Sequence, residues 1–366
     1  MKLAIQNRGK VWGGNEKWVT TLAKGLASRG HEVVVSCRQG PLQARLESIG
    51  VRTTRFRPRG SVDFLSGLSF AGWLGREKPD ALLLTSWQPL TWSVFAARVA
   101  GIRRVVLRQG IVRDFPRSPS RATALRSVDA IIANSEEIRE AWQRSAPAPT
   151  GDKVKVVMNG IEPAAMEPAD ARGRLRGEIG CGETTFVVGG AGHLFPRKGF
   201  DVLVRAFAGA AIADSRLVIV GDGDQLRPLQ GLAAEMGIAD RVHWLGHRDD
   251  GPAVIAGLDL FVLSSHNEGM ANVMLEAMAA AVPVIASDVS GVRSAIGARS
   301  KRTAAGWIVS PQETSGFALA ISELASRLRR GDDEVKKRVS EAQWRIENWF
   351  GVDRMIDECE AILFDA

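Results

Sequence analysis

The chain has few cysteines, no long apolar run and no recognised nucleic-acid-binding module. Its three cysteines, Cys37, Cys181 and Cys359, form neither a CxxC pair nor a zinc-binding spacing, so free thiols in a reducing compartment are expected. No apolar run approaches the ~18 residues that a membrane-spanning helix needs. The first strand pattern follows Met1 without a signal peptide, which favours a cytoplasmic protein. Nucleic acid is not expected as a partner.

The length and composition favour a globular protein with two domains. The chain has 366 residues, of which 45% are apolar and 24% are charged. Its formal net charge is +7. This basic excess suits an anionic substrate or an anionic membrane surface.

Residues 258–283 are the most informative stretch, because a strand pattern runs there into a helix pattern. Residues 258–263 are apolar except for Asp259, as in a buried parallel strand. The helical periodicity that follows ends near Pro283. We expect this helix to open at Gly269, so that three polar residues spaced by four fall roughly on one of its faces. These residues are Glu268, Asn272 and Glu276.

The start of this predicted helix is a candidate anion site. Backbone amides at a helix N-terminus lack intrahelical partners, and phosphate is their usual ligand. The amides concerned belong to Gly269, Met270 and Ala271. Glu268 stands at the start of the predicted helix and Glu276 two turns later. This arrangement suits a ligand with a phosphate between two hydroxyl-rich rings, such as a nucleotide-sugar.

The segment from Glu268 to Glu276, followed by residues 283–291, resembles the donor-site signature of retaining GT-B glycosyltransferases of family 4. This resemblance implies an α/β fold of two Rossmann-like βαβ domains facing a central cleft. It also implies that the C-terminal helix crosses back to the N-terminal domain. The expected domains are residues 1–162 with about 350–366, which would bind the acceptor, and residues 170–349, which would bind the nucleotide-sugar; the Pro- and Ala-rich stretch 163–170 is the linker between them.

Residues 190–199 resemble the G-R-x-x-x-x-K-G loop of the same family, whose Arg and Lys hold the donor diphosphate. Lys198 matches the family lysine, whereas His193 stands where an arginine is usual. Arg197 could supply the missing charge, because a guanidinium can clamp phosphate with two hydrogen bonds. A solvated Arg-Lys pair is the alternative.

Two stretches of the N-terminal half extend the resemblance. Residues 13–16 are similar to the family's GG-x-E loop, which implies that Gly14 lies near the donor phosphates and Asn15 near the acceptor. Gln109 stands where family members usually carry histidine; it can bond a sugar hydroxyl but cannot carry a proton. Arg108 is either a contact for an anionic acceptor or a surface arginine.

The resemblance also implies that the edge of the donor domain lies beside the nucleobase, mostly through backbone atoms of Gly246 and His247. Asp222 and Asp224 have the spacing of a metal-binding DxD motif. We interpret them instead as part of the family's Gly-Asp-Gly turn, because related GT-B enzymes generally need no metal. No metal and no cofactor are therefore expected.

The resemblance implies transfer of a sugar from a UDP- or GDP-sugar to a hydroxyl of a glycan or lipid-linked acceptor, with retention. Lys198 and Arg197 would stabilise the leaving diphosphate. Glu268 would hold the sugar hydroxyls and Glu276 the ribose. No second carboxylate is placed as in glycosidases, so the diphosphate would take the acceptor proton. Cell-envelope polysaccharide or lipopolysaccharide synthesis is the expected setting.

Other interpretations stay open at this point. A GT-B nucleotide-sugar epimerase would act on the donor alone, and a non-catalytic GT-B module would only bind. A dinucleotide-dependent oxidoreductase is disfavoured because GxGxxG is absent. The basic and aromatic residues of 52–79 allow peripheral contact with the inner membrane, or a solvated edge over a core helix.

Overall fold

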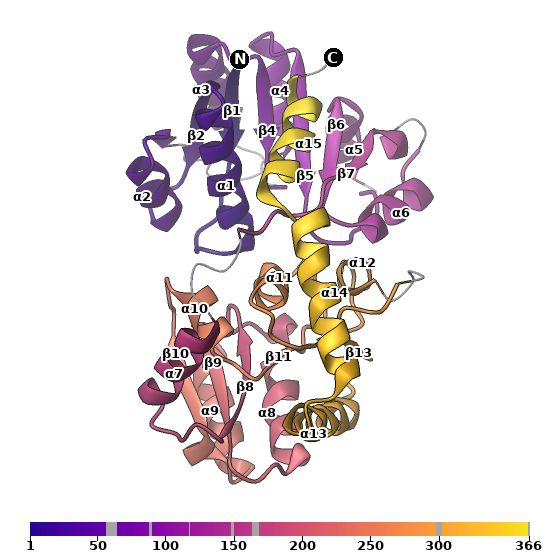
Figure 1. Cartoon of the computed structure of the whole chain (residues 1–366). Coiled ribbons are helices and arrows are strands. Elements are labelled where there is room, and N and C mark those ends of the chain that lie inside the picture. Colours follow the sequence, from indigo (N-terminus) through magenta and orange to yellow (C-terminus); the bar gives the residue numbers. More distant parts are fainter. Residues whose placement is uncertain are drawn as a thin grey trace. The chain divides into compact units, whose positions relative to one another are not determined.

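The structure is a computed structural model that describes residues 1–55, 64–87, 90–116, 118–147, 150–162, 168–297 and 302–364. The chain forms two compact units, residues 1–160 with 352–366 and residues 161–351. Each unit is a parallel sheet with helices between successive strands (Figure 1). This is the two-fold βαβ organisation that the sequence predicted.

In the described residues, the first unit contains a seven-stranded sheet in the order β3-β2-β1-β4-β5-β6-β7, and every neighbouring pair is parallel. The inner strands are apolar on both faces because helices cover both sides of the sheet. The strands are β1 (Lys2–Gln6), β2 (Glu32–Cys37), β3 (Arg52–Arg55), β4 (Ala81–Leu84), β5 (Arg104–Gln109), β6 (Ala130–Ala133) and β7 (Val154–Val156).

The helices of the first unit build one hydrophobic core on each face of the sheet. Successive strand residues alternate between the two cores: Leu3 and Ile5 belong to one, and Ala4 belongs to the other. The first core contains residues of α1 (Gly14–Ser28), α2 (Pro41–Ser48) and α15 (Val352–Phe364). The second contains residues of α3 (Phe64–Glu77), α4 (Leu90–Val99), α5 (Pro119–Arg126) and α6 (Glu136–Ser145). The 3₁₀ turn η1 (Thr150–Lys153) precedes β7.

The last helix, α15, belongs to the first unit, which confirms the prediction that it returns to the N-terminal domain. Figure 1 shows it beside α1 and the central strands of that sheet. Gly25 of α1 allows the close approach, since a Cβ there would lie 2.1 Å from Cδ1 of Ile356. The Arg29 guanidinium also donates to Oε2 of Glu360 at 2.7 Å.

The second unit contains, within the described ranges, a six-stranded parallel sheet in the order β10-β9-β8-β11-β12-β13. Its strands are β8 (Phe186–Ala191), β9 (Ser215–Val220), β10 (Val242–Gly246), β11 (Leu260–Leu263), β12 (Val284–Ser287) and β13 (Trp307–Val309). Its helices are α7 (Pro168–Glu178), η2 (Pro196–Lys198), α8 (Phe200–Ala210), α9 (Leu226–Glu235), η3 (Ala239–Arg241), α10 (Gly251–Ala256), α11 (Asn272–Ala279), α12 (Val292–Ile296), α13 (Thr314–Arg329) and α14 (Asp333–Trp349).

Two predictions of local structure need correction or completion. The helix expected to open at Gly269 begins at Asn272, so Glu268 lies in the preceding loop and shares no helix face with Glu276. The segment beginning at Arg52 forms the edge strand β3 before α3. Residues 163–167 of the predicted linker and residues 56–63 of the predicted basic segment lie outside the described residues.

No helix within the described ranges combines the length and apolar character that a bilayer crossing requires.

Candidate functional site

Each sheet has one point where the strand order reverses direction. In the second unit this point lies between β8 and β11, and in the first unit between β1 and β4. At this point the loops after the two neighbouring strands lead away in opposite directions. Open α/β sheets bind their ligands between such loops, at the carboxyl ends of the strands. The predicted donor motifs of residues 190–199 and 268–276 follow β8 and β11; of the predicted acceptor residues, Asn15 follows β1, and Arg108 and Gln109 end β5.

The loops after β8 and β11 pack tightly against each other. Gly199 ends the first loop with a φ of +62°, and a Cβ at this position would lie 2.1 Å from the carbonyl oxygen of Ser264. The Ser264 hydroxyl donates to the Gly199 carbonyl at 2.7 Å. The His266 amide also donates to the Arg197 carbonyl at 2.8 Å. Glycine is therefore required where the two loops meet.

A cluster of two cations and one carboxylate lies at this junction. The Lys198 ammonium donates to Oε1 of Glu268, and an Arg197 guanidinium nitrogen lies 3.6 Å from Oε2. The Glu268 and Lys198 side chains are only 8% and 13% exposed, whereas that of Arg197 is 46% exposed. The cluster keeps one net positive charge, which suits an anionic ligand.

Sequence reasoning did not assign a role to Ser265, which orients the central carboxylate. Its hydroxyl donates to Oε1 of Glu268 at 2.9 Å. The only sequence signal is its position, two residues after an apolar strand, at the edge where ligands bind. Glu268 thus accepts from both Ser265 and Lys198, so its side chain has little freedom to turn away.

Free backbone amides follow Glu268, although the helix begins later than predicted. The amides of Gly269, Met270 and Ala271 donate no hydrogen bond to any described residue. All three residues are buried. The first hydrogen bond at the start of the helix runs from the Met274 amide to the Ala271 carbonyl, at 3.0 Å. Buried unpaired amides are rare in folded proteins, and an oxyanion would satisfy them.

A glycine in the loop after β12 allows that loop to lie close to the loop after β11, which carries these amides. Gly291 has a φ of +75°, and a Cβ there would lie 1.7 Å from the Gly269 carbonyl oxygen. Within α11, Asn272 and Glu276 lie one turn apart, and Glu276 is buried. The amides, Asn272 and Glu276 are therefore held by one short segment.

The other predicted donor residues occupy the loops of neighbouring strands. The His193 ring stacks on Phe195, with ring centres 5.4 Å apart. The Gly246 carbonyl accepts from the Gly221 amide at 2.7 Å, which joins the loop after β9 to the last residue of β10. His247 is more than half exposed, and its Nε2 lies 3.6 Å from Oδ1 of Asp249. β10, which ends at Gly246, lies two positions from β8 in the sheet, so Gly246 and His247 stand apart from the Lys198 cluster, whereas His193 lies in the same loop as Lys198.

The Asp222–Asp224 segment forms a tight turn. The Gly223 amide donates to Oδ1 of Asp222 at 2.7 Å. A Cβ on Gly223 would lie 2.5 Å from the Leu194 carbonyl oxygen, so the turn packs closely on the loop after β8. The described residues contain no group of three or more His, Cys, Asp or Glu side chains arranged to hold a metal.

In the first unit, the GG-x-E residues begin α1, with Gly13 as the N-cap and Gly14 as the first helical residue. The Asn15 carboxamide reaches across the switch point and donates to the Thr85 carbonyl at 3.5 Å. Its oxygen accepts from the Arg108 guanidinium at 2.8 Å. Asn15, which follows β1, therefore connects the loop after β4 with the end of β5.

Arg108 is buried beneath this loop rather than presented at the surface. Its guanidinium also donates to Oδ1 of Asn159 at 3.2 Å and lies 4.3 Å from the centre of the Trp18 ring. Burial lowers the pKa of Arg108 to about 10, and the negative charge of Glu16 opposes this shift. The geometry gives Arg108 a role in holding Asn15.

The Gln109 carboxamide has a fixed orientation. It accepts from the Trp87 indole and donates to the Ile111 carbonyl. The side chain is almost fully buried. Its oxygen and nitrogen each keep capacity for one further hydrogen bond.

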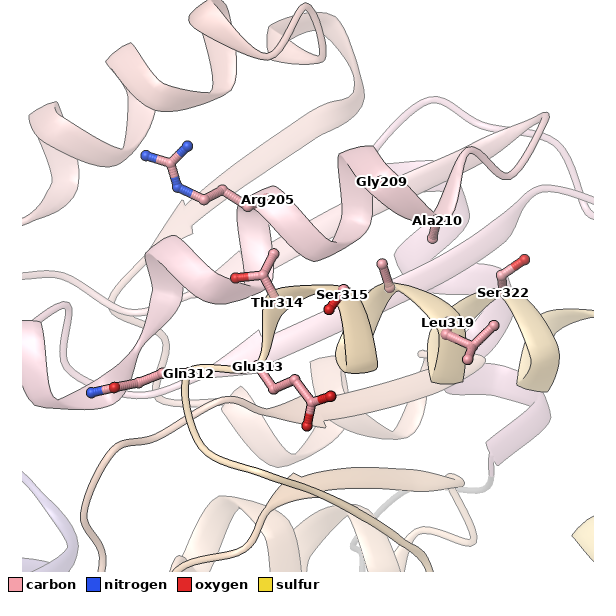
Figure 2. Close-up of a pocket in the computed structure, with 10 residues that line it drawn as sticks. Arg205, Gly209, Ala210, Gln312, Glu313, Thr314, Ser315, Leu319 and Ser322 are labelled. Atoms are coloured by element: carbon pink, nitrogen blue, oxygen red, sulfur yellow. The ribbon is translucent and has the colours of Figure 1, made fainter.

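A separate surface pocket of about 810 Å³ lies between α8 and α13 of the second unit (Figure 2). Arg205, Glu313 and Thr314 are among the residues that line it. None of the site residues predicted from the sequence belongs to this lining. The pocket is therefore separate from the cluster around Glu268.

Comparison with known proteins identifies the family of the chain. A family model for Glycosyltransferase Family 4 matches residues 12–165, and one for Glycosyl transferases group 1 matches residues 184–327. The lipopolysaccharide core biosynthesis glycosyltransferase LpsE of Rhizobium meliloti (strain 1021) is 27% identical over 348 residues, which cover 93% of this chain and 92% of LpsE.

A second relative is more similar over a shorter stretch. The GDP-mannose-dependent alpha-(1-6)-phosphatidylinositol monomannoside mannosyltransferase of Mycolicibacterium smegmatis is 30% identical over 294 residues, which cover 76% of this chain and 72% of that protein. Among solved structures, Anabaena HepE in complex with UDP and glucose has a TM-score of 0.82 at 23% identity, with 98% of both chains covered. The last match concerns the fold alone. The chain belongs to the group 1, family 4 glycosyltransferases and is a glycosyltransferase of the GT-B fold.

Proposed function

We propose that the protein transfers a sugar from a nucleotide-sugar to a hydroxyl of a glycan or lipid-linked acceptor, with retention at the anomeric carbon. The observation that carries this proposal is the cluster of Lys198, Arg197 and Glu268 directly before the unpaired amides of residues 269–271. Cations held beside a carboxylate that precedes free amides would provide a site for a diphosphate. UDP- and GDP-sugars are the candidate donors, because HepE was solved with UDP and the mannosyltransferase relative is GDP-mannose-dependent.

Charge stabilisation at the leaving group would provide most of the catalysis. The bond between the anomeric carbon and the diphosphate oxygen breaks, and negative charge grows on the phosphate. Lys198 has three N–H donors, so it can bond this phosphate while it remains paired with Glu268. Arg197 is exposed enough to reach the same group. Donors fixed before the reaction lower the barrier because they need no reorganisation.

The acceptor hydroxyl would attack from the face that the diphosphate leaves. A bond forms between its oxygen and the anomeric carbon, and its proton passes to the departing phosphate oxygen. Glu268 would hold sugar hydroxyls and balance the positive anomeric centre, while Glu276 would bind the ribose. This route needs no second carboxylate of the kind that glycosidases use.

The acceptor would bind at the carboxyl edge of the first sheet. Asn15 and Gln109 are both fixed there by hydrogen bonds to other loops. The similarity to LpsE, a lipopolysaccharide core biosynthesis glycosyltransferase, supports an acceptor from cell-envelope polysaccharide or lipopolysaccharide.

A peripheral contact with the inner membrane is part of the same proposal. Leu65 and Leu68 of α3, and Phe95 and Val99 of α4, are large apolar side chains exposed on two helices that pack together. Such a surface would lie against lipid headgroups without crossing the bilayer.

A panel of nucleotide-sugars in a thermal-shift assay tests the donor proposal, because a ligand that binds only the folded state raises its melting temperature. The selected donor is then incubated with and without a glycan acceptor, and the anomeric configuration of the product is read by NMR. We expect an acceptor-dependent product with the configuration of the donor. Donor turnover without acceptor would favour the epimerase, and an absence of nucleotide-sugar binding would favour the non-catalytic module.

A further inference from the structure

Two arginines follow neighbouring strands at the carboxyl edge of the first sheet. In the register of β1 and β2, Gln6 pairs with Ser36, and Arg8 and Arg38 each come two residues later. Both side chains are partly buried. Equivalent positions on adjacent parallel strands place the two arginines at the same edge, next to each other.

Neither guanidinium has an acidic partner in the part of the chain that the structure describes. The Nε atoms of Arg8 and Arg38 are both buried and without a hydrogen-bond acceptor. Burial lowers the pKa of Arg8, and the charge of Arg38 lowers it further. By contrast, Arg98 of the same unit is paired with Asp129 at 2.9 Å. Two like charges with unsatisfied donors are stabilised when an anion binds between them.

The position of Arg8 connects this pair to the acceptor edge. Its backbone amide donates to the hydroxyl of Ser86 at 3.2 Å, across the switch point between β1 and β4. The adjacent Asn7 side chain donates to Thr85 at 3.1 Å, the residue whose carbonyl also accepts from Asn15. The donor diphosphate is already assigned to the loops of the other unit, so the anion bound here would belong to the second substrate.

We propose that Arg8 and Arg38 bind an anionic group of the acceptor, either a phosphate or a carboxylate. Guanidinium groups match both oxyanions through paired hydrogen bonds. This inference rests on the proposed function, and it adds a charge requirement to the acceptor. A neutral glycan would leave the two cations uncompensated.

Calorimetry on the full-length protein tests this requirement with three probes: glucose 1-phosphate, glucuronate and glucose. The titrations contain saturating UDP or GDP, whichever matches the selected donor, so that the donor phosphate site is filled. The test variant is R8Q/R38Q. The control variant is K24Q/R103Q, which removes two exposed positive charges, one in the C-terminal half of α1 and one directly before β5.

We expect the wild-type protein to bind at least one charged sugar more tightly than glucose, and R8Q/R38Q to weaken that binding by at least about tenfold. The control should bind as the wild type does. A preference for glucose 1-phosphate identifies a phosphorylated acceptor, and a preference for glucuronate identifies an acidic sugar. Any of three results overturns the proposal. The wild type binds charged and neutral sugars equally, it binds neither charged sugar, or R8Q/R38Q binds the charged sugar as tightly as the wild type does.

Donor affinity, measured on the same variants, separates this inference from the proposed function. R8Q/R38Q should bind the nucleotide-sugar as tightly as the wild type, because the cations and amides assigned to the donor diphosphate, Lys198, Arg197 and residues 269–271, are unchanged. If the wild-type protein bound no nucleotide-sugar, the proposed function would fail. The titration of charged sugars would still report on the arginine pair.

Discussion

Lys198 and Glu268 form an ion pair that is largely shielded from water, although 70 positions separate them along the chain. They meet because β8 and β11 are neighbours in the sheet and the two residues lie in the loops after those strands. The unpaired amides of residues 269–271 follow directly. This arrangement gives the site a fixed carboxylate beside a fixed cation.

Replacing Lys198 by alanine should lower turnover by at least ~100-fold, since removal of one charge-stabilising donor commonly costs this much. Glu268 would also lose its closest cation. Steady-state kinetics with the selected donor provides the measurement. Lys337→Ala, at an exposed position of α14, is the matched control and should keep wild-type activity. A Lys198→Ala enzyme with near wild-type turnover would remove this residue from the mechanism.

Glu276→Ala should weaken nucleotide binding by about tenfold or more, because a carboxylate bonded to ribose hydroxyls makes charge-assisted hydrogen bonds. Calorimetry with the nucleoside diphosphate measures this loss, and the far-UV spectrum checks that the fold is intact. Glu235→Ala removes an exposed carboxylate from the end of α9 and serves as the control. An unchanged dissociation constant for Glu276→Ala would refute the ribose assignment.

Gly199→Ala should destabilise the second unit by about 2 kcal/mol or more, because the new Cβ would meet the Ser264 carbonyl in a left-handed backbone region. Urea unfolding gives the change in free energy. Gly231→Ala lies inside α9 with open space around its Cβ, and it should be neutral or stabilising by up to about 1 kcal/mol. Equal stability of the two variants would show that the loop junction relaxes without cost.

The three cysteines should differ in reactivity. Burial raises the pKa of Cys37 to about 11 and that of Cys359 to about 12, from an ordinary value of 9.0, whereas Cys181 is partly exposed. Near pH 8, a thiol reagent should therefore modify Cys181 first in the native protein and all three cysteines after unfolding. Mass spectrometry of the labelled peptides identifies the sites.

The same shifts have a consequence for stability at alkaline pH. The folded state holds the two buried thiol protons more tightly than the unfolded state does. Their contribution to the free energy of unfolding is therefore complete below about pH 9, and it decreases as the pH rises through the folded pKa values. Rapid labelling of Cys359 in the folded protein would contradict both predictions.

The strands could be predicted from the sequence because their residues are apolar on both faces. Residues 81–84 and 260–263 are buried in full, and their hydrophobic runs mark them clearly. The edge strand β3 was missed because its residues, Arg52–Arg55, are polar and half-exposed. The order of the strands, and hence which loops meet, is set by long-range packing that no local pattern contains.

The start of α11 was placed too early for an identifiable reason. The helical spacing of Glu268, Asn272 and Glu276 continues into the loop, and the actual N-cap is Ala271, which has no side chain to cap the helix. The burial of Arg108 was equally hidden, because Asn15, Trp18 and Asn159 surround it from distant parts of the chain. Motif positions were therefore predictable, whereas their partners were not.

The return of α15 to the first unit affects how the protein emerges from the ribosome. Residues 1–160 are synthesised early, but Met355, Ile356 and Leu363 fill part of the hydrophobic core around α1. That core stays incomplete until the whole of 161–351 has been translated. A nascent first half would thus present an unfilled apolar surface to chaperones, and deletion of the final helix should produce insoluble protein rather than a working fragment.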